Sequence, residues 1–303
     1  MIPSGLPHLE KLVAHQLAMF PEHVFFLTNR FSALTGAEYQ FADRIAEKII
    51  QIAGCHLERV CADYRWLNGI VLDEELYFRR NGRYRLSTFE EADAQYYSNS
   101  KFMSRYMNGL LASQLWWRNH TEMLQYFRDD FLEHNPHGFS HLEIGPGHGL
   151  FLYFAATSPN CRSASAWDIS DASLQKTRSA LAAMHLDRQV LLKKVDIFAA
   201  PKEEFTSIVF SEVLEHLERP QDALAILHGL LADKGRIFLN APVNSPAPDH
   251  LYLFETPEQI LQMIADAGFT VESSRFSPYT GVTLERARKK KLTISVGVIV
   301  RKA

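Results

Sequence analysis

The chain has 303 residues, a formal net charge of −3 at pH 7, and 47% hydrophobic and 22% charged residues. This composition supplies enough apolar side chains for a large core and excludes a mostly disordered chain. The small net charge, without a basic stripe interleaved with aromatic residues, argues against nucleic acid as a partner.

The beginning of the chain, MIPSGLPHLEKLVAHQL, carries polar residues and a carboxylate where a signal peptide needs an uninterrupted apolar core. Apolar runs such as residues 294–300 fall far short of the roughly 20 residues that span a bilayer. Cys55, Cys61 and Cys161 are odd in number and form no Cys/His ligand pattern. We therefore predict a cytoplasmic protein with no membrane partner, no disulfide framework and no bound metal.

Residues 1–135 follow a mostly helical rhythm. Apolar residues three and four apart in residues 41–53 and 102–117 predict amphipathic helices, and Met107 lies on the face of the second that is expected to be core. The Asn81-Gly82 pair, between two aromatic stretches that favour β structure, predicts a short hairpin or turn. This half is expected to form a helical lid or substrate domain.

The sequence EHNPHGFS at residues 133–140 replaces the helical pattern and is typical of a linker, so we divide the chain into residues 1–135 and 136–303. In the second part, strand-like and helical segments alternate, which predicts a doubly wound α/β sheet. Seven strands are expected, over residues 141–145, 163–168, 189–194, 206–210, 236–240, 270–276 and 292–300.

The sequence LEIGPGHGLF at residues 142–151 ends an apolar strand in a glycine-rich turn that opens a helix. Glycines let the backbone turn sharply and approach a ligand, since they have no Cβ. Asp168 lies at the end of the next strand, 19 residues past Gly149, where its carboxylate can accept both hydroxyls of a ribose. Asp171 is the expected cap of the following helix, which leaves Asp168 free for the ligand.

Two further segments follow in order. Val195-Asp196-Ile197 comes after the third strand and offers an acceptor and an apolar side chain where the amino edge and face of an adenine would lie. The fourth strand runs into SEVLEH, residues 211–216, whose start overlooks the carboxyl edge of the sheet, the usual ligand crevice of such folds.

Residues 141–300 resemble the class I S-adenosylmethionine-dependent methyltransferases in their ExGxGxG first motif, acidic ribose contact, Asp-apolar adenine contact and VLEH-type fourth motif. The resemblance implies a Rossmann-like seven-stranded methyltransferase sheet with an antiparallel last strand, together with an N-terminal mostly helical lid domain. It also implies S-adenosylmethionine as the cofactor. The residues that it assigns to the cofactor are Glu143, Gly145, Gly147 and Gly149 at the methionyl part, Asp168 at the ribose, Asp196 and Ile197 at the adenine, and Ser211 beside the sulfonium. Ile169, next to Asp168, is also predicted to bind the cofactor.

Candidate catalytic residues come from both halves. A general base assists methyl transfer to a hydroxyl or an enolisable carbon, and histidine suits this role near neutral pH. His216 lies in the fourth motif, and His250 lies in a proline-rich loop expected to overhang the crevice; a structural role remains the alternative for both. Tyr97, Tyr106 and His120 belong to an aromatic-rich stretch that can reach the ligand, because aromatic faces stabilise cations such as a sulfonium.

The first functional interpretation is O-, N- or C-methylation of a small molecule. The second is a cyclisation or aminocarboxypropyl transfer that releases methylthioadenosine. The stretch WLNGIVLDEELYFRRNGRYRLS at residues 66–87, with its aromatic-rich continuation, resembles the lid of azetidine-2-carboxylate synthases. A noncatalytic S-adenosylmethionine-binding module is the third, and the intact glycine turn argues against it. A nicotinamide dehydrogenase fits the fourth motif poorly. The acceptor and the oligomeric state stay open, with a homodimer among the alternatives.

Overall fold

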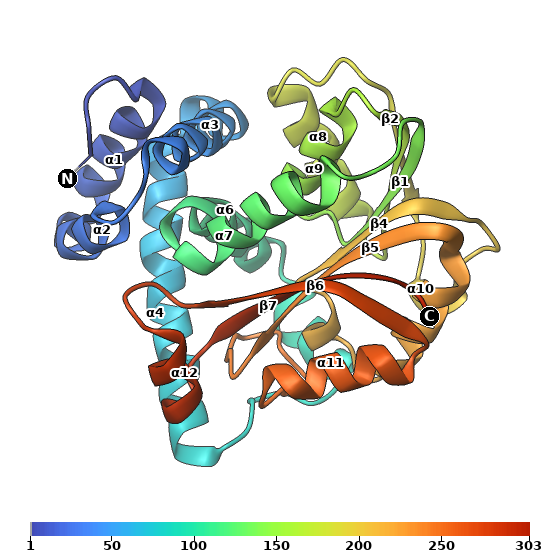
Figure 1. Cartoon of the computed structure of the whole chain (residues 1–303). Coiled ribbons are helices and arrows are strands. Elements are labelled where there is room, and N and C mark those ends of the chain that lie inside the picture. Colours follow the sequence, from blue (N-terminus) through green and yellow to red (C-terminus); the bar gives the residue numbers. More distant parts are fainter. Residues whose placement is uncertain (1) are drawn as a thin grey trace.

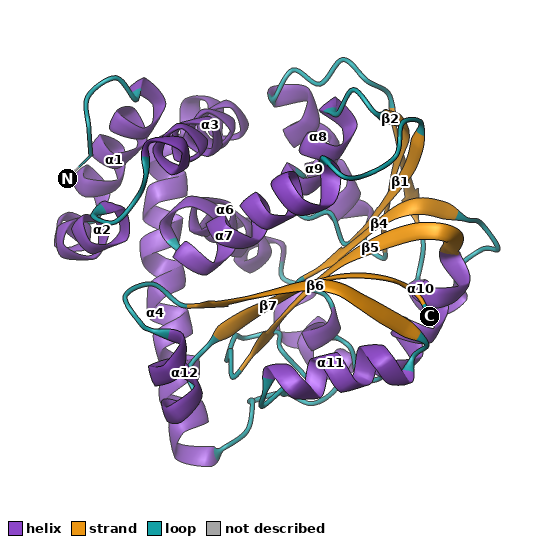
Figure 2. Cartoon of the chain, in the orientation of Figure 1, coloured by secondary structure: helices purple, strands orange, loops and turns teal. Residues whose placement is uncertain are grey.

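The computed structural model describes residues 2–303, and seven strands form its centre (Figures 1 and 2). The strands are β1 (Phe139–Ile144), β2 (Cys161–Asp168), β3 (Val190–Lys194), β4 (Phe205–Ser211), β5 (Leu231–Val243), β6 (Phe269–Pro278) and β7 (Ile294–Lys302). They form one sheet in the order β3-β2-β1-β4-β5-β7-β6, in which β7 runs antiparallel to β5 and β6. The predicted doubly wound sheet with an antiparallel last strand is confirmed.

Twelve α-helices within residues 2–303 surround or extend this sheet. The N-terminal helices are α1 (Pro7–Met19), α2 (Val24–Phe31), α3 (Gly36–Ala53), α4 (Leu57–Asn81), α5 (Phe89–Ala92), α6 (Ser100–Trp116) and α7 (Arg118–Tyr126). The helices interleaved with the strands are α8 (Leu150–Thr157), α9 (Asp171–Ala183), α10 (Pro220–Leu230), α11 (Pro257–Asp266) and α12 (Leu284–Lys290). The helical N-terminal region is thus present as predicted.

Two apolar clusters fill the two sides of the sheet, because alternate residues of a strand point to opposite faces. Phe238 packs with the N-terminal helices and α8, whereas its neighbour Leu239 packs with α10 and α11 on the other side. Helix α7 lies directly on the sheet: a Cβ added at Gly297 of β7 would stand 2.5 Å from Met123 Sδ. One continuous core therefore joins the helical region to the sheet, and the division at residue 135 remains a prediction.

The predicted hairpin at Asn81-Gly82 is wrong. Helix α4 continues to Asn81, and Gly82 follows it in the left-handed conformation with φ +67°, donating its N–H to the Phe78 carbonyl. Asn-Gly suits both a tight hairpin and a left-handed helix end, since both require a positive φ. Of the flanking aromatic residues, Phe78 lies on the buried side of α4 and Tyr84 lies in the segment that follows the helix. Their ring centroids are 5.7 Å apart.

No helix among residues 2–303 combines the length and the apolar character that crossing a membrane requires.

Candidate active site

The glycine-rich turn follows β1 at the carboxyl edge of the sheet. Gly145, Gly147 and Gly149 have φ angles of +70°, +49° and +74°, a region that residues with a Cβ rarely adopt. Met107 of α6 reaches this turn, because its Cε would lie 3.4 Å from a Cβ added at Gly147. Met107 is partly exposed there and is not the core residue that the helical pattern predicted.

Glu143 occupies the strand just before this turn. Its side chain is buried at 3% exposure, and Oε2 has no hydrogen-bond partner within residues 2–303. Burial raises the pKa of this carboxyl well above its usual range. A buried acceptor without a donor, beside a backbone cradle, fits a ligand that brings an ammonium or hydroxyl group, as S-adenosylmethionine does.

Asp168 ends β2 and holds the turn that follows. Its carboxylate accepts a hydrogen bond of 2.8 Å from Ser170 N and one of 2.6 Å from Ser173 Oγ. The expected cap, Asp171, is wrong: Ser170 caps α9, while Asp171 is the first helical residue and pairs with Lys194. Each carboxylate oxygen of Asp168 retains a further lone pair, so two ribose hydroxyls could still donate to it. The neighbouring Ile169 is half exposed.

Asp196 and Ile197 stand at the end of β3. Asp196 is exposed, and its Oδ1 accepts a hydrogen bond of 2.9 Å from Phe198 N, which caps a short 3-10 turn. Ile197 is buried in the core, whereas Phe198 is partly exposed and carries the Arg219 guanidinium 4.8 Å from its ring centroid. The apolar surface that β3 presents here therefore comes from Phe198, which the motif did not single out.

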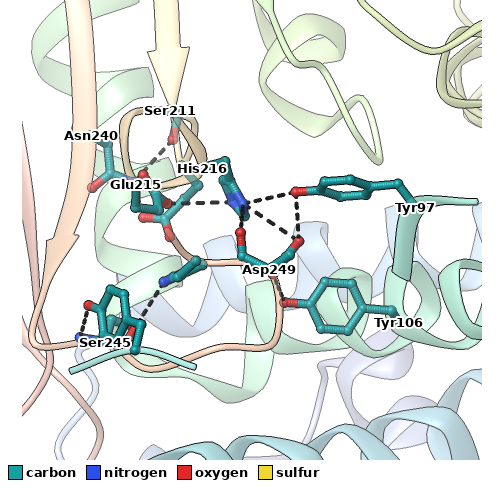
Figure 3. Close-up of polar contacts among 11 residues, drawn as sticks. Tyr97, Tyr106, Ser211, Glu215, His216, Asn240, Ser245 and Asp249 are labelled. Carbon is teal, nitrogen blue, oxygen red and sulfur yellow. Dashed lines mark hydrogen bonds and ion pairs between the residues drawn. The ribbon is translucent and has the colours of Figure 1, made fainter. Parts of the chain in front are cut away.

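Two predicted tyrosines meet the carboxyl edge from the helical region (Figure 3). Tyr97, in the π-helical turn η3 (Asp93–Tyr97), lies 3.2 Å from His216 Nδ1 and donates to Asp249 Oδ2 at 3.3 Å. Tyr106 of α6 donates to Asp249 Oδ1 at 2.8 Å. Asp249, which is 4% exposed, was missed because no sequence motif contains it. Asp249 therefore links the helical region to the loop that follows β5.

His250, the second predicted histidine, lies beside His216, and their ring centroids are 4.8 Å apart. Its Nδ1 is 2.6 Å from the Ser245 carbonyl, and burial lowers the pKa of His250 to about 4, so the ring is neutral at pH 7. Glu215 lies with the two histidines and is fully buried. The structure thus brings together Tyr97, Tyr106, His216 and His250.

Ser211, at the end of β4, lies at the margin of the same region. Asn240 of β5 donates from Nδ2 to Ser211 Oγ at 3.1 Å and to Glu212 Oε1 at 2.8 Å. Glu212 has a φ of +54°, a strained conformation for a residue with a long side chain. Because strain of this kind collects at functional sites, Glu212 is a further candidate that the motif contained and that the sequence alone did not mark.

His120 stands apart from the tyrosine cluster. Its Nδ1 lies 3.0 Å from Ser113 Oγ and 3.2 Å from Gln114 Nε2, and its ring meets Trp117 edge-on. Burial, reinforced by nearby His148 of the glycine turn, lowers the pKa of His120 to about 3. Within residues 2–303, no hydrogen bond connects it with Tyr97, Tyr106 or His216, so His120 is not part of the tyrosine cluster.

The sequence matches the family described as methyltransferase domain over residues 116–289, more than half of the chain. No curated protein matches it. Among solved structures, the mitomycin 7-O-methyltransferase MmcR is 13% identical, with 83% of this chain and 72% of that chain covered and a TM-score of 0.55. A SAM-dependent methyltransferase from Aquifex aeolicus is 15% identical (59% and 92% covered, TM-score 0.45), and the [4+2]-cyclase SpnF is 14% identical (60% and 79% covered, TM-score 0.46). At these identities the likeness to MmcR concerns the fold alone.

Proposed function

The chain belongs to the family of methyltransferase domains and uses S-adenosylmethionine as its cofactor, and from this premise we propose that it methylates a small molecule at oxygen, nitrogen or an activated carbon. The observation that carries the proposal is a pair of hydrogen bonds between the helical region and the carboxyl edge of the sheet: Tyr97 and Tyr106 both donate to Asp249. A polar site covered by helices suits an acceptor small enough to be enclosed.

The proposed cofactor site follows the carboxyl edge of the sheet. The unpartnered oxygen of Glu143 would receive the α-ammonium group, and the positive-φ glycines leave room for the methionyl chain beside the backbone. The remaining assignments are Asp168 and Ile169 to the ribose, Asp196 and Ile197 to the adenine, and Ser211 to the neighbourhood of the sulfonium.

At the acceptor end, the proposed task of the protein is alignment. Methyl transfer is an in-line displacement: the nucleophile attacks the methyl carbon, and the carbon–sulfur bond breaks with its electron pair passing to sulfur. Correct alignment can contribute about 7 to 11 kcal/mol. Burial and the Asp249 charge raise the pKa of Tyr97, so its phenol stays protonated and can orient an acceptor as a hydrogen-bond donor. The group that accepts the proton of the acceptor must therefore be sought at His216 and His250.

A second candidate function rests on the aromatic lining of the lid. Tyr97 stacks on Phe89 with ring centroids 5.7 Å apart, and Tyr106 stacks on Phe102 at 5.6 Å. Such faces would favour a sulfonium, and a dry pocket would leave the cofactor's own α-amine free to react. The amine nitrogen would attack the γ-carbon, the bond from that carbon to sulfur would break, and azetidine-2-carboxylate, methylthioadenosine and a proton would result.

One experiment separates the two functions. Purified protein is incubated with S-adenosylmethionine alone and then with mixtures of phenols, alcohols and amines, and the products are followed by liquid chromatography and mass spectrometry. Methyl transfer predicts an intact cofactor until an acceptor is present, and then equal amounts of adenosylhomocysteine and methylated product. Methylthioadenosine together with a cyclic amino acid, formed without acceptor, would instead establish cyclisation. A cofactor that is bound but never consumed by any mixture would contradict both.

A further inference from the structure

Glu215, His216 and His250 form a compact group at the carboxyl edge. Glu215 and His216 belong to the short helical turn η6 (Leu214–His216) after β4, and His250 comes from the loop after β5. One side-chain oxygen or nitrogen from each lies within 4.8 Å of the other two. Figure 3 shows the Glu215 and His216 side chains side by side, with Asp249 below the imidazole in this view. Two chain segments more than 30 residues apart thus converge on one point.

Both histidines are held in the same manner. His250 Nδ1 lies 2.6 Å from the Ser245 carbonyl, and His216 Nδ1 lies 3.0 Å from the Asp249 carbonyl. A carbonyl oxygen can only accept, so both Nδ1 atoms carry the proton and both Nε2 atoms keep a free lone pair. Proteins orient metal-binding histidines in this way, with the distal nitrogen toward the ion and the other N–H fixed by a backbone carbonyl.

Glu215 supplies a second and independent observation. Its side chain is fully buried, and neither carboxylate oxygen receives a hydrogen bond from any donor in residues 2–303. Burying a carboxylate without a partner is costly, and a cation bound between it and two imidazoles would remove that cost.

We propose that Glu215, His216 and His250 bind one divalent transition-metal cation, of the chemistry of Zn²⁺ or Mn²⁺. Two imidazole nitrogens and one carboxylate suit such ions and leave coordination positions open for another ligand. Bonds of about 2.0 to 2.2 Å place neighbouring ligand atoms about 3.3 Å apart, so the group must close slightly around the ion. Asn240 and the strained Glu212 are then positioning residues, since Glu212 lies against Glu215 and is held by the Asn240 amide.

The site also gives the proposed methyl transfer a substrate class, and this step rests on that proposed function. An alcohol or phenol oxygen in an open position would lose its proton to water more readily, because a bound cation lowers the pKa of an oxygen ligand. The resulting oxyanion attacks the methyl carbon, and the sulfur leaves with the electron pair. The two histidines, each a candidate base by sequence, then act jointly as ligands.

Metal binding can be measured without cofactor or acceptor. The full chain is treated with a chelator, desalted, and titrated with ZnCl₂ and separately with MnCl₂ by calorimetry. We expect about one ion per chain. Glu215→Gln keeps the shape of the side chain but removes its charge, and it should weaken binding at least about 10-fold, as should His250→Gln. The matched control is His137→Ala, which removes an exposed histidine from the turn before β1 and should bind as the wild type does.

A second measurement identifies the ligands directly. Electron paramagnetic resonance of the Mn²⁺ form should show coupling to imidazole nitrogen that His250→Gln diminishes. Failure of the wild type to bind either ion stoichiometrically would overturn the metal site, and so would unchanged affinity in both ligand variants. If an ion binds but no acceptor is methylated, only the proposed function fails. Methyl transfer by protein that binds no ion would refute this inference and leave a free imidazole as the base.

Discussion

Asp168 has two tasks in this structure, because it supports the turn before α9 and is the proposed ribose acceptor. Asp168→Asn keeps one carbonyl oxygen for the turn and loses the charge. We expect the dissociation constant for S-adenosylmethionine to rise about 30-fold, equivalent to about 2 kcal/mol for lost charge-assisted hydrogen bonds. Calorimetric titration of both proteins with S-adenosylmethionine measures the two dissociation constants.

The matched control for this change is Asp171→Asn, three residues further along. The Asp171 side chain is 75% exposed and pairs only with Lys194, so its loss should leave the affinity for S-adenosylmethionine unchanged. Wild-type affinity in Asp168→Asn would mean that the ribose is bound elsewhere.

Individual site residues were predictable where a local pattern specifies them. The glycines of the turn could be named because only glycine readily adopts their φ angles. Asp249 could not, because its role depends on Tyr106, which lies 143 positions earlier in the chain. The sequence likewise did not show that Glu215, His216 and His250 lie close together. The loop that carries His250 comes next to η6 only in the folded chain.

At the scale of elements, α4 and α6 pack closely against each other in the helical region. A Cβ added at Gly109 of α6 would stand 2.8 Å from Leu67 Cβ and 3.3 Å from the Asp63 carbonyl. Gly109→Ala should therefore separate the helices and reduce the free energy of unfolding by about 1 to 3 kcal/mol. Denaturation with urea, followed by circular dichroism, measures the change.

Gly69→Ala in α4 provides the comparison for this helix pair. Its added Cβ would meet no atom within 4 Å, and alanine favours the helix over glycine by about 0.5 to 1 kcal/mol. We expect it to be neutral or stabilising. Equal destabilisation by both variants would refute the close contact between α4 and α6.

Elements themselves were largely predictable, because several strands carry a run of apolar residues, such as residues 237–239 in β5 and residues 298–300 in β7. The error at Asn81-Gly82 has a physical origin: a hairpin turn and a left-handed helix end require the same backbone conformation. Ser170 rather than Asp171 caps α9 for a similar reason, since both residue types favour that position. Local sequence leaves such pairs undecided until packing selects one.

For the molecule as a whole, the way the helical region packs onto the sheet could not be predicted from the sequence. The periodicity predicted a helical half and an α/β half, yet the face of α7 that contacts β7 depends on the fit of Met123 and Tyr126 against Gly297. The polar contacts between the two halves could not be predicted either. Tyr97 can donate to Asp249 only after the apolar core has brought the two halves together. The composition of the site is therefore a consequence of the overall packing.

Buried titratable groups in both halves make the stability of the whole molecule depend on pH. Burial lowers the pKa of five histidines to about 3 or 4: His23, His120, His141, His148 and His250. The unfolded chain binds their protons below about pH 6.5, so the stability that they contribute is present above that pH and is lost as pH falls. Four carboxyls have raised pKa values and act in the opposite direction: Glu143, Asp168, Glu212 and Glu215.

Because the histidines outnumber these carboxyls, we expect the midpoint of thermal unfolding of the free protein to fall between pH 7 and pH 5. The contribution of Glu143 is present below about pH 4.5 and is lost as pH rises, so it offsets part of this fall. Glu143→Gln removes the offset: the variant should be more stable than the wild type at pH 8, and its midpoint should fall more steeply toward pH 5. Circular dichroism at four pH values measures this, with the exposed Glu133→Gln as a control that should follow the wild type. A wild type that is more stable at pH 5 than at pH 7 would mean that the carboxyls outweigh the histidines and would contradict the prediction.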